Sequence, residues 1–154
     1  MTPQKPIKRA YEQNPVKVKK WLDEEYPSIQ SQAKKEKATI FWGDEMGIRS
    51  DHQAGRSFSK KGQTPVIKNA GKRFSFNMIS AISNKGNLNF MLYEANFTVD
   101  VFIQFMQRMI RQRKEKVFLI LDNLKVHHAK KAKAWVEKHS NEIELFFCPL
   151  TAQS

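Results

Sequence analysis

Five consecutive apolar residues, Val117 to Leu121, end directly at Asp122. A run this short, apolar at every position, is typical of a strand that is covered on both faces. Such strands lie inside parallel or mixed sheets, so the run favours an α/β fold over a helical bundle or a one-sided sheet. It is the longest apolar run in the chain and falls far short of the roughly 18 residues that a membrane span needs.

The pattern around this run predicts a mixed sheet. Apolar residues recur with helical spacing in segments 14–37, 98–114 and about 128–140, and runs of strand length fill 39–46, 74–83, 88–94, 117–121 and 143–147. The turn at 84–87 makes its flanking strands an antiparallel hairpin, whereas helices separate the later strands and make them parallel. We therefore expect five strands, the first three antiparallel, with helices against the faces. Pro27 should kink the first helix.

The charge of the chain favours a polyanion as partner. Its 154 residues include 27 Lys and Arg against 15 Asp and Glu, a net charge of +12. Seven basic residues and one acid in segment 47–73 supply half of that surplus. We expect this segment to contact DNA or RNA phosphates without reading bases, although a solvated loop with no partner would have the same composition. The residues singled out for this contact are Arg56, Lys60, Lys61, Lys72 and Arg73.

Two aspartates follow apolar strand runs. Asp44 and Asp122 would stand at the carboxyl ends of buried strands, where ligands gather in open α/β sheets. Parallel neighbours lie about 4.8 Å apart, so the two carboxylates could share Mg²⁺ or Mn²⁺. For either aspartate alone, the simpler interpretation is a turn residue that ends a strand. Glu45 should point to the opposite face and is not counted as a third ligand.

Polar residues after Asp122 are candidates for a supporting role. His127 and His128 could touch phosphate or help to shape the site, although a histidine pair at the start of a helix is more often structural. Asn123 is expected to order the turn. The single cysteine, Cys148, excludes an intramolecular disulfide and a cysteine-based zinc site. With no secretory signal visible, it favours the cytoplasm.

Several motifs together resemble a known family. The segments Trp42–Gly47 (WGDEMG), Lys61–Pro65 (KGQTP), Leu119–Asn123 (LILDN) and His127–Ala129 (HHA) are similar to the DDE domain of bacterial insertion-sequence transposases of the mariner-like superfamily. The resemblance implies a ribonuclease-H-like fold and DNA as the partner. It also implies that Asp44 and Asp122 are the first two catalytic acids, which with a third hold Mg²⁺ for strand cleavage and transfer.

The resemblance also divides the chain. Residues 1–37 correspond to a linker and N-terminal helix, and 38–154 to the catalytic domain. The family places its third acid on a helix after the last strand, whereas no acid follows Glu144 here. We therefore expect a truncated transposase with little activity alone, able to associate with itself or with a full-length transposase. The alternatives are a non-catalytic DNA-binding remnant and the non-functional product of a disrupted gene.

Overall fold

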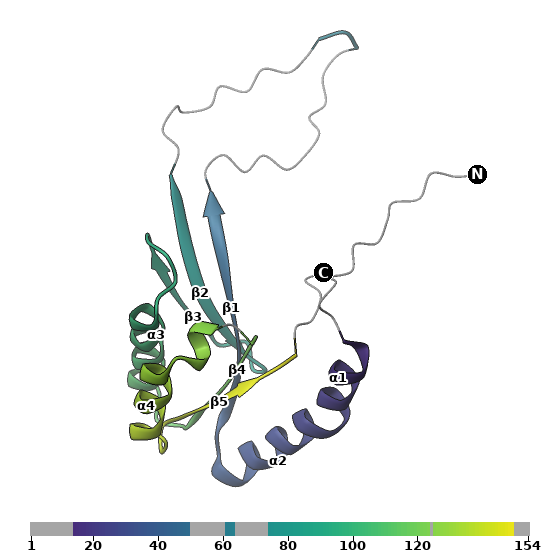
Figure 1. The fold of residues 1–154 in the computed structure, drawn as a ribbon, viewed down its shortest axis with the longest axis vertical. Coiled ribbons are helices and arrows are strands. Elements are labelled where there is room, and N and C mark those ends of the chain that lie inside the picture. Colours follow the sequence, from purple (N-terminus) through teal and green to yellow (C-terminus); the bar gives the residue numbers. More distant parts are fainter. Residues whose placement is uncertain (1–13, 50–60, 64–73, 124, 150–154) are drawn as a thin grey trace, which may run out of the picture.

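The computed structural model describes residues 14–49, 61–63, 74–123 and 125–149. Its five strands form one mixed sheet in the order β3-β2-β1-β4-β5 (Figure 1). The strands are β1 (Thr39–Arg49), β2 (Ser75–Ser83), β3 (Leu88–Tyr93), β4 (Val117–Leu121) and β5 (Ile143–Phe147). β2 runs antiparallel to β1 and β3, whereas β4 runs parallel to β1 and β5. This arrangement confirms the predicted mixed sheet.

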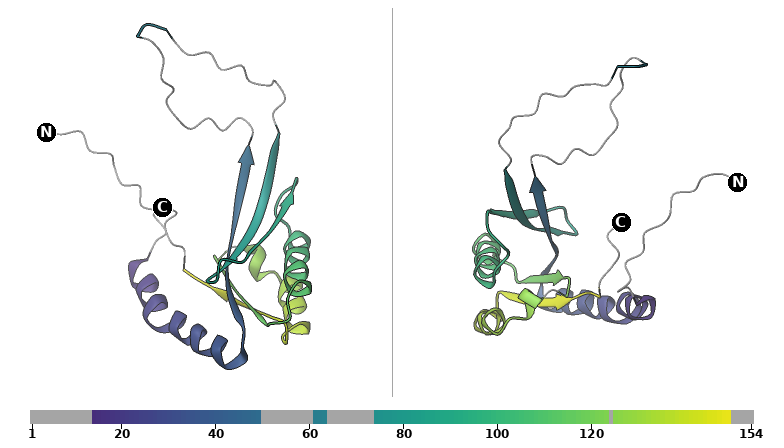
Figure 2. Two further views of the ribbon diagram at one scale, coloured as in Figure 1. Left: turned by 180° about the vertical axis from the view of Figure 1, so that it is seen from behind. Right: turned by 45° about the horizontal axis from the view of Figure 1, so that its top comes forward.

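Helices cover the sheet on two sides (Figures 1 and 2). Helices α3 (Val99–Arg111) and α4 (Lys130–Lys138) pack on one face, over a core that includes Phe41, Leu119 and Leu121. Helix α1 (Pro15–Lys20) has no buried residue and leads into a π-helical turn (Trp21–Glu25). That turn and helix α2 (Tyr26–Glu36) contribute to a second core, which includes Ile40 and Phe118. Every residue of β4 is buried because it lies between the two cores.

The first helix packs on the predicted catalytic domain. Its residues Trp21, Ile29 and Ala33 are buried in the second core together with residues of β1 and β4. Residues 14–37 therefore share a core with strands β1 and β4. None of the helices in the described ranges is long and apolar enough to cross a bilayer.

Local sequence signals account for the ends of the helices. The side chain of Asn14 accepts hydrogen bonds from the amides of Val16 and Lys17, and Thr98 caps α3 in the same way. The chain stays helical through Pro27, where a kink was expected. A π-helical turn at Trp21–Glu25 precedes the proline, which has no amide to donate into the ladder.

The last helix is shorter than its pattern predicted. A helix was expected from about His128 to Ser140, but a 3₁₀ turn spans Lys125–His128 and α4 begins only at Lys130. Ala129 precedes α4 in an extended conformation and its side chain makes no capping hydrogen bond. His127 belongs to this 3₁₀ turn, and its buried side chain packs against Phe102 of the first core.

Candidate active site

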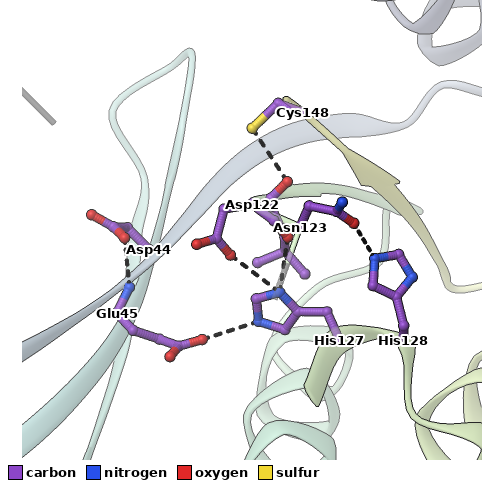
Figure 3. A network of polar contacts seen from close by, with 8 residues as sticks. Asp44, Glu45, Asp122, Asn123, His127, His128 and Cys148 are labelled. Carbon is purple, nitrogen blue, oxygen red and sulfur yellow. Dashed lines mark hydrogen bonds and ion pairs between the residues drawn. The ribbon is translucent and has the colours of Figure 1, made fainter. Parts of the chain in front are cut away.

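The sheet has a step where β4 ends beside β1. Parallel pairing between these strands stops at Trp42 and Ile120, whereas the pairing of β1 with β2 continues to the end of β1. Asp44 and Asp122 each lie two residues beyond the last parallel pair. Both carboxylates therefore start from the same level on adjoining strands, as Figure 3 shows. The structure thus brings together the two aspartates predicted to share a site.

The two aspartates are held in different ways. Asp44 is exposed, and its Oδ1 accepts a hydrogen bond of 2.8 Å from the amide of Glu45, the next residue along β1. Asp122 is half-buried, and its main chain and side chain both meet the same histidine. Asp44 is therefore oriented by its own strand, whereas Asp122 is oriented by a residue in the 3₁₀ turn.

That histidine is His127, whose side chain is 1% exposed. Its Nδ1 lies 3.0 Å from the main-chain oxygen of Asp122 and 3.3 Å from Asp122 Oδ1. Its Nε2 lies 3.0 Å from Glu45 Oε1, and the ring packs against Phe97 and Phe102. Every one of these oxygens is an acceptor when the carboxylates are ionised, so both ring nitrogens donate only in the imidazolium form.

The surroundings of His127 favour that form. Burial by itself would lower the pKa of His127. The hydrogen bonds to Glu45 and to the Asp122 main chain, with the charges of both carboxylates, outweigh burial and raise the pKa above its ordinary value. The buried imidazole thus lies between the carboxylates of Asp122 and Glu45, and both favour its protonated form.

The other predicted supporting residues lie on the outer side of the same turn. His128 Nε2 makes a hydrogen bond with Asn123 Oδ1, and the His128 ring lies 4.1 Å from the ring centroid of Phe147 at the end of β5. Asn123 is exposed and follows Asp122 directly. These contacts connect the turn after β4 to β5, and Figure 3 shows Asn123 and His128 beside the end of β4.

Cys148 completes the row of strand ends. β4 and β5 pair as far as Leu121 and Phe147, so Cys148 lies level with Asp122. Its Sγ donates to the main-chain oxygen of Leu121 at 3.3 Å, and its amide donates to the same oxygen at 2.9 Å. Burial raises the pKa of the Cys148 thiol, and the charges of Asp122 and then Asp44 raise it further. The pKa of the Cys148 thiol therefore depends on the charges of both aspartates.

The predicted DNA-contacting residues are less fully described. Arg56, Lys60, Lys72 and Arg73 lie outside the described residues. Lys61 is exposed and lies in the described turn at 61–63. The structure therefore leaves the basic segment as a prediction.

Two residues of the site were not identified from the sequence. Glu45 was set aside because strand alternation turns it away from the face of Asp44, and its contact with His127 is on that other face. The alternation was informative, but nothing local in the sequence predicts a histidine 82 residues later as its partner. Cys148 was considered only for a disulfide, a zinc site and the redox compartment, although it directly follows the predicted strand 143–147, as the aspartates follow theirs.

The donor atoms suit a hard divalent cation. Asp44 and Asp122 offer carboxylate oxygens, which Mg²⁺ and Mn²⁺ prefer, and Mg²⁺ commonly takes only one or two carboxylates from a protein. Among the residues that the structure describes, no group of three or more His, Cys, Asp and Glu side chains is arranged to hold a metal ion. The two aspartates therefore fit an ion that takes its other ligands from water or substrate.

Comparison with solved structures identifies similar folds. The chain matches the Mos1 strand transfer complex with a TM-score of 0.60 and 19% identity, covering 100% of this chain and 48% of that one. It matches a Mos1 mariner paired end complex with Mn at 0.57 and 17%, covering 94% and 47%. For the catalytic domain of Mos1 mariner transposase the values are 0.51 and 16%, covering 94% and 65%.

These likenesses confirm the predicted ribonuclease-H-like fold. The chain spans about half the length of the Mos1 chains in the two complexes. The comparison with curated proteins finds no match. A family model described as "DDE superfamily endonuclease" matches residues 39–153, which is most of the chain and includes both aspartates. The chain therefore belongs to the DDE superfamily of endonucleases.

Proposed function

We propose that this domain binds Mg²⁺ or Mn²⁺ between Asp44 and Asp122 and acts in DNA strand cleavage and transfer during transposition. The observation that carries the proposal is the level position of the two carboxylates at the ends of adjoining parallel strands. Solved Mos1 paired end complexes with Mn and with Mg support the choice of ion. Complexes of Mos1 transposase with a transposon end support DNA as the substrate.

The reaction is a displacement at phosphorus. The oxygen of water or of a DNA 3′ hydroxyl attacks, and the bond to the leaving oxygen breaks. When bound, the divalent ion supplies charge stabilisation for the attacking and leaving oxygens. The chain contributes two carboxylates whose spacing is set by the sheet backbone, and His127 holds one of them against movement. Misplacement of reacting groups by about 1 Å can cost on the order of a hundredfold in rate.

Of the three acids that the family resemblance implies, the described residues provide Asp44 and Asp122. Glu144, the last acid in the sequence, lies near the start of β5, where it contacts Lys116 and Gln32. The aspartates lie at the other ends of the strands. We therefore expect residues 1–154 alone to bind the ion weakly and to cleave slowly. Association with a second copy or with a full-length transposase is a route by which a third acid could be supplied.

Metal binding is the most direct test of the proposal. Mn²⁺ titration followed by electron paramagnetic resonance should give saturable binding, which Asp44→Asn and Asp122→Asn each weaken by at least about tenfold. Plasmid nicking in Mn²⁺ should fall in parallel. Glu24→Gln, a change in an exposed carboxylate of the π-helical turn, is the matched control. Equal Mn²⁺ affinity in all four proteins would remove the metal site.

A second candidate function is DNA binding without catalysis, favoured by the charge of segment 47–73. Phosphate contacts give affinity that is independent of sequence and falls steeply with salt. Neutralising Lys60, Lys61, Lys72 and Arg73 together should weaken binding to unrelated duplexes by the same factor and flatten the salt dependence. Unchanged affinity would contradict a role for this segment.

A further inference from the structure

The contacts of His127 extend beyond Asp122 to Glu45. Glu45 lies next to Asp44 on β1, but its side chain passes to the opposite face of the sheet and meets His127 Nε2 at 3.0 Å. The other ring nitrogen meets Asp122. One buried ring therefore joins the residue after the first aspartate to the second aspartate, across the gap that opens where the parallel pairing ends (Figure 3).

The Glu45 side chain is mostly covered, with 19% of it exposed. Its partner His127 packs in turn against the rings of Phe97 and Phe102. The charge of Glu45 also raises the pKa of Tyr93, after the effect of burial. Burying a carboxylate costs free energy unless a hydrogen-bond partner compensates it, and His127 Nε2, 3.0 Å from Glu45 Oε1, is that partner.

We propose that Glu45 is a positioning residue, which acts through His127 to hold the Asp122 carboxylate in the orientation needed for a divalent ion. This inference rests on the proposed metal site. Its logic is that of an outer-shell hydrogen bond: a ligand that is itself oriented by a fixed donor loses less freedom when the ion binds. His127 cannot rotate to release Asp122, because its other nitrogen is held by Glu45 and its faces by two phenylalanines.

The two aspartates are held by contacts with different parts of the fold. Asp44 is held by the amide of its own strand, which the sheet keeps in place. Asp122 lies one residue beyond the end of β4, and His127 contacts both its main chain and its carboxylate. Glu45 belongs to β1, so the anchor for the second aspartate is built on the same rigid strand as the first. The separation of the two carboxylates is then set by one strand.

The test compares Mn²⁺ affinity and stability in matched variants of the full 154-residue chain. Glu45→Ala should weaken Mn²⁺ binding by about tenfold to a hundredfold, the range for lost outer-shell partners. Glu45→Gln, whose amide oxygen still accepts from Nε2, should retain affinity to within about threefold of the wild type. His127→Phe keeps an aromatic ring in the pocket and should lose affinity like Glu45→Ala. Glu24→Ala is the exposed control.

Two further measurements separate positioning from folding. Urea denaturation reports the stability of each variant and so identifies any that is poorly folded. Loss of Mn²⁺ affinity in Glu45→Ala, together with its retention in Glu45→Gln, supports a positioning role. In the metal-free protein, ¹⁵N NMR of the His127 ring should show Nε2 in a hydrogen bond, and Glu45→Ala should change the Nε2 signal. An unchanged Nε2 signal would overturn the hydrogen bond and the inference.

The outcomes also distinguish this inference from the metal site. If Asp44→Asn and Asp122→Asn lose Mn²⁺ but Glu45→Ala and His127→Phe bind like the wild type, the metal site stands and the positioning role is wrong. If the wild type binds Mn²⁺ no better than the aspartate variants, the metal site is wrong and the positioning role falls with it.

Discussion

The two halves of the sheet are packed differently. Its parallel half, formed by β4, β5 and the beginning of β1, has helices on both faces, and β4 is buried at every position. In its antiparallel half, β3 alternates exposed and buried residues, and Ile82, Leu88, Phe90 and Leu92 stand exposed on its open side. The candidate site lies where the first half gives way to the second, at the step beside the end of β4.

This difference shows why the site is where it is. β4 ends at Leu121 while β1 continues to Arg49, so a strand end lies beside a strand middle. The half that is covered on both faces sets the level of both aspartates, and the parallel pairing ends two residues before each of them. Carboxylates can reach a common ligand only where the backbone of one strand no longer fills the space beside the other.

The sharpest way to test this contrast is to remove one phenylalanine from each half. Phe118 is 0% exposed and packs against Phe146 at a ring-centroid distance of 5.0 Å, whereas Phe90 is 57% exposed. Phe118→Ala should lower the free energy of unfolding by about 3–5 kcal/mol. Phe90→Ala should change it by less than about 0.5 kcal/mol. Urea denaturation measures both, and similar losses would contradict the difference between the halves.

A smaller effect is expected from two glycines of β1 on either side of the step. A Cβ at Gly43 would lie 2.6 Å from Leu121 Cδ2 and 3.3 Å from Leu119 Cδ1, so Gly43→Ala should cost about 1–3 kcal/mol by overpacking the core.

Gly47 is the matched control for this change. The nearest atom to its Cβ would be Asn77 Oδ1 at 3.5 Å, an ordinary contact. Gly47→Ala should be neutral or should stabilise by up to about 1 kcal/mol, through the unfolded chain. Urea unfolding that shows equal losses for the two glycines would place no tight contact at the step.

The thiol of Cys148 provides a finer probe of the site itself. Because burial and the charges of Asp122 and Asp44 raise its pKa, iodoacetamide should alkylate it slowly at pH 8. Asp122→Asn and Asp44→Asn should each lower the pKa and speed alkylation by roughly twofold to tenfold. Glu24→Gln should leave the rate unchanged. If Asp44→Asn also leaves it unchanged, the first aspartate does not converge on the strand ends.

Much of the fold was predictable because it depends on local patterns. The all-apolar run 117–121 identified β4, the turn at 84–87 identified the β2–β3 hairpin, and Asn14 and Thr98 marked helix starts. Where the prediction was wrong, backbone geometry overrode the pattern. The helical spacing after Asp122 could not distinguish a 3₁₀ turn from an α-helix over so few residues.

The sequence by itself determined which side chains stand at the ends of the strands. Strand length and alternation are local properties, so the order of residues predicted the positions of Asp44 and Asp122 and the opposite facing of Glu45. Only the tertiary structure decided what those side chains meet. The register between β1 and β4 set the two aspartates level, and the 3₁₀ turn put His127 between Asp122 and Glu45. Those contacts join residues far apart in the chain, so they depend on how the elements pack rather than on any local sequence preference.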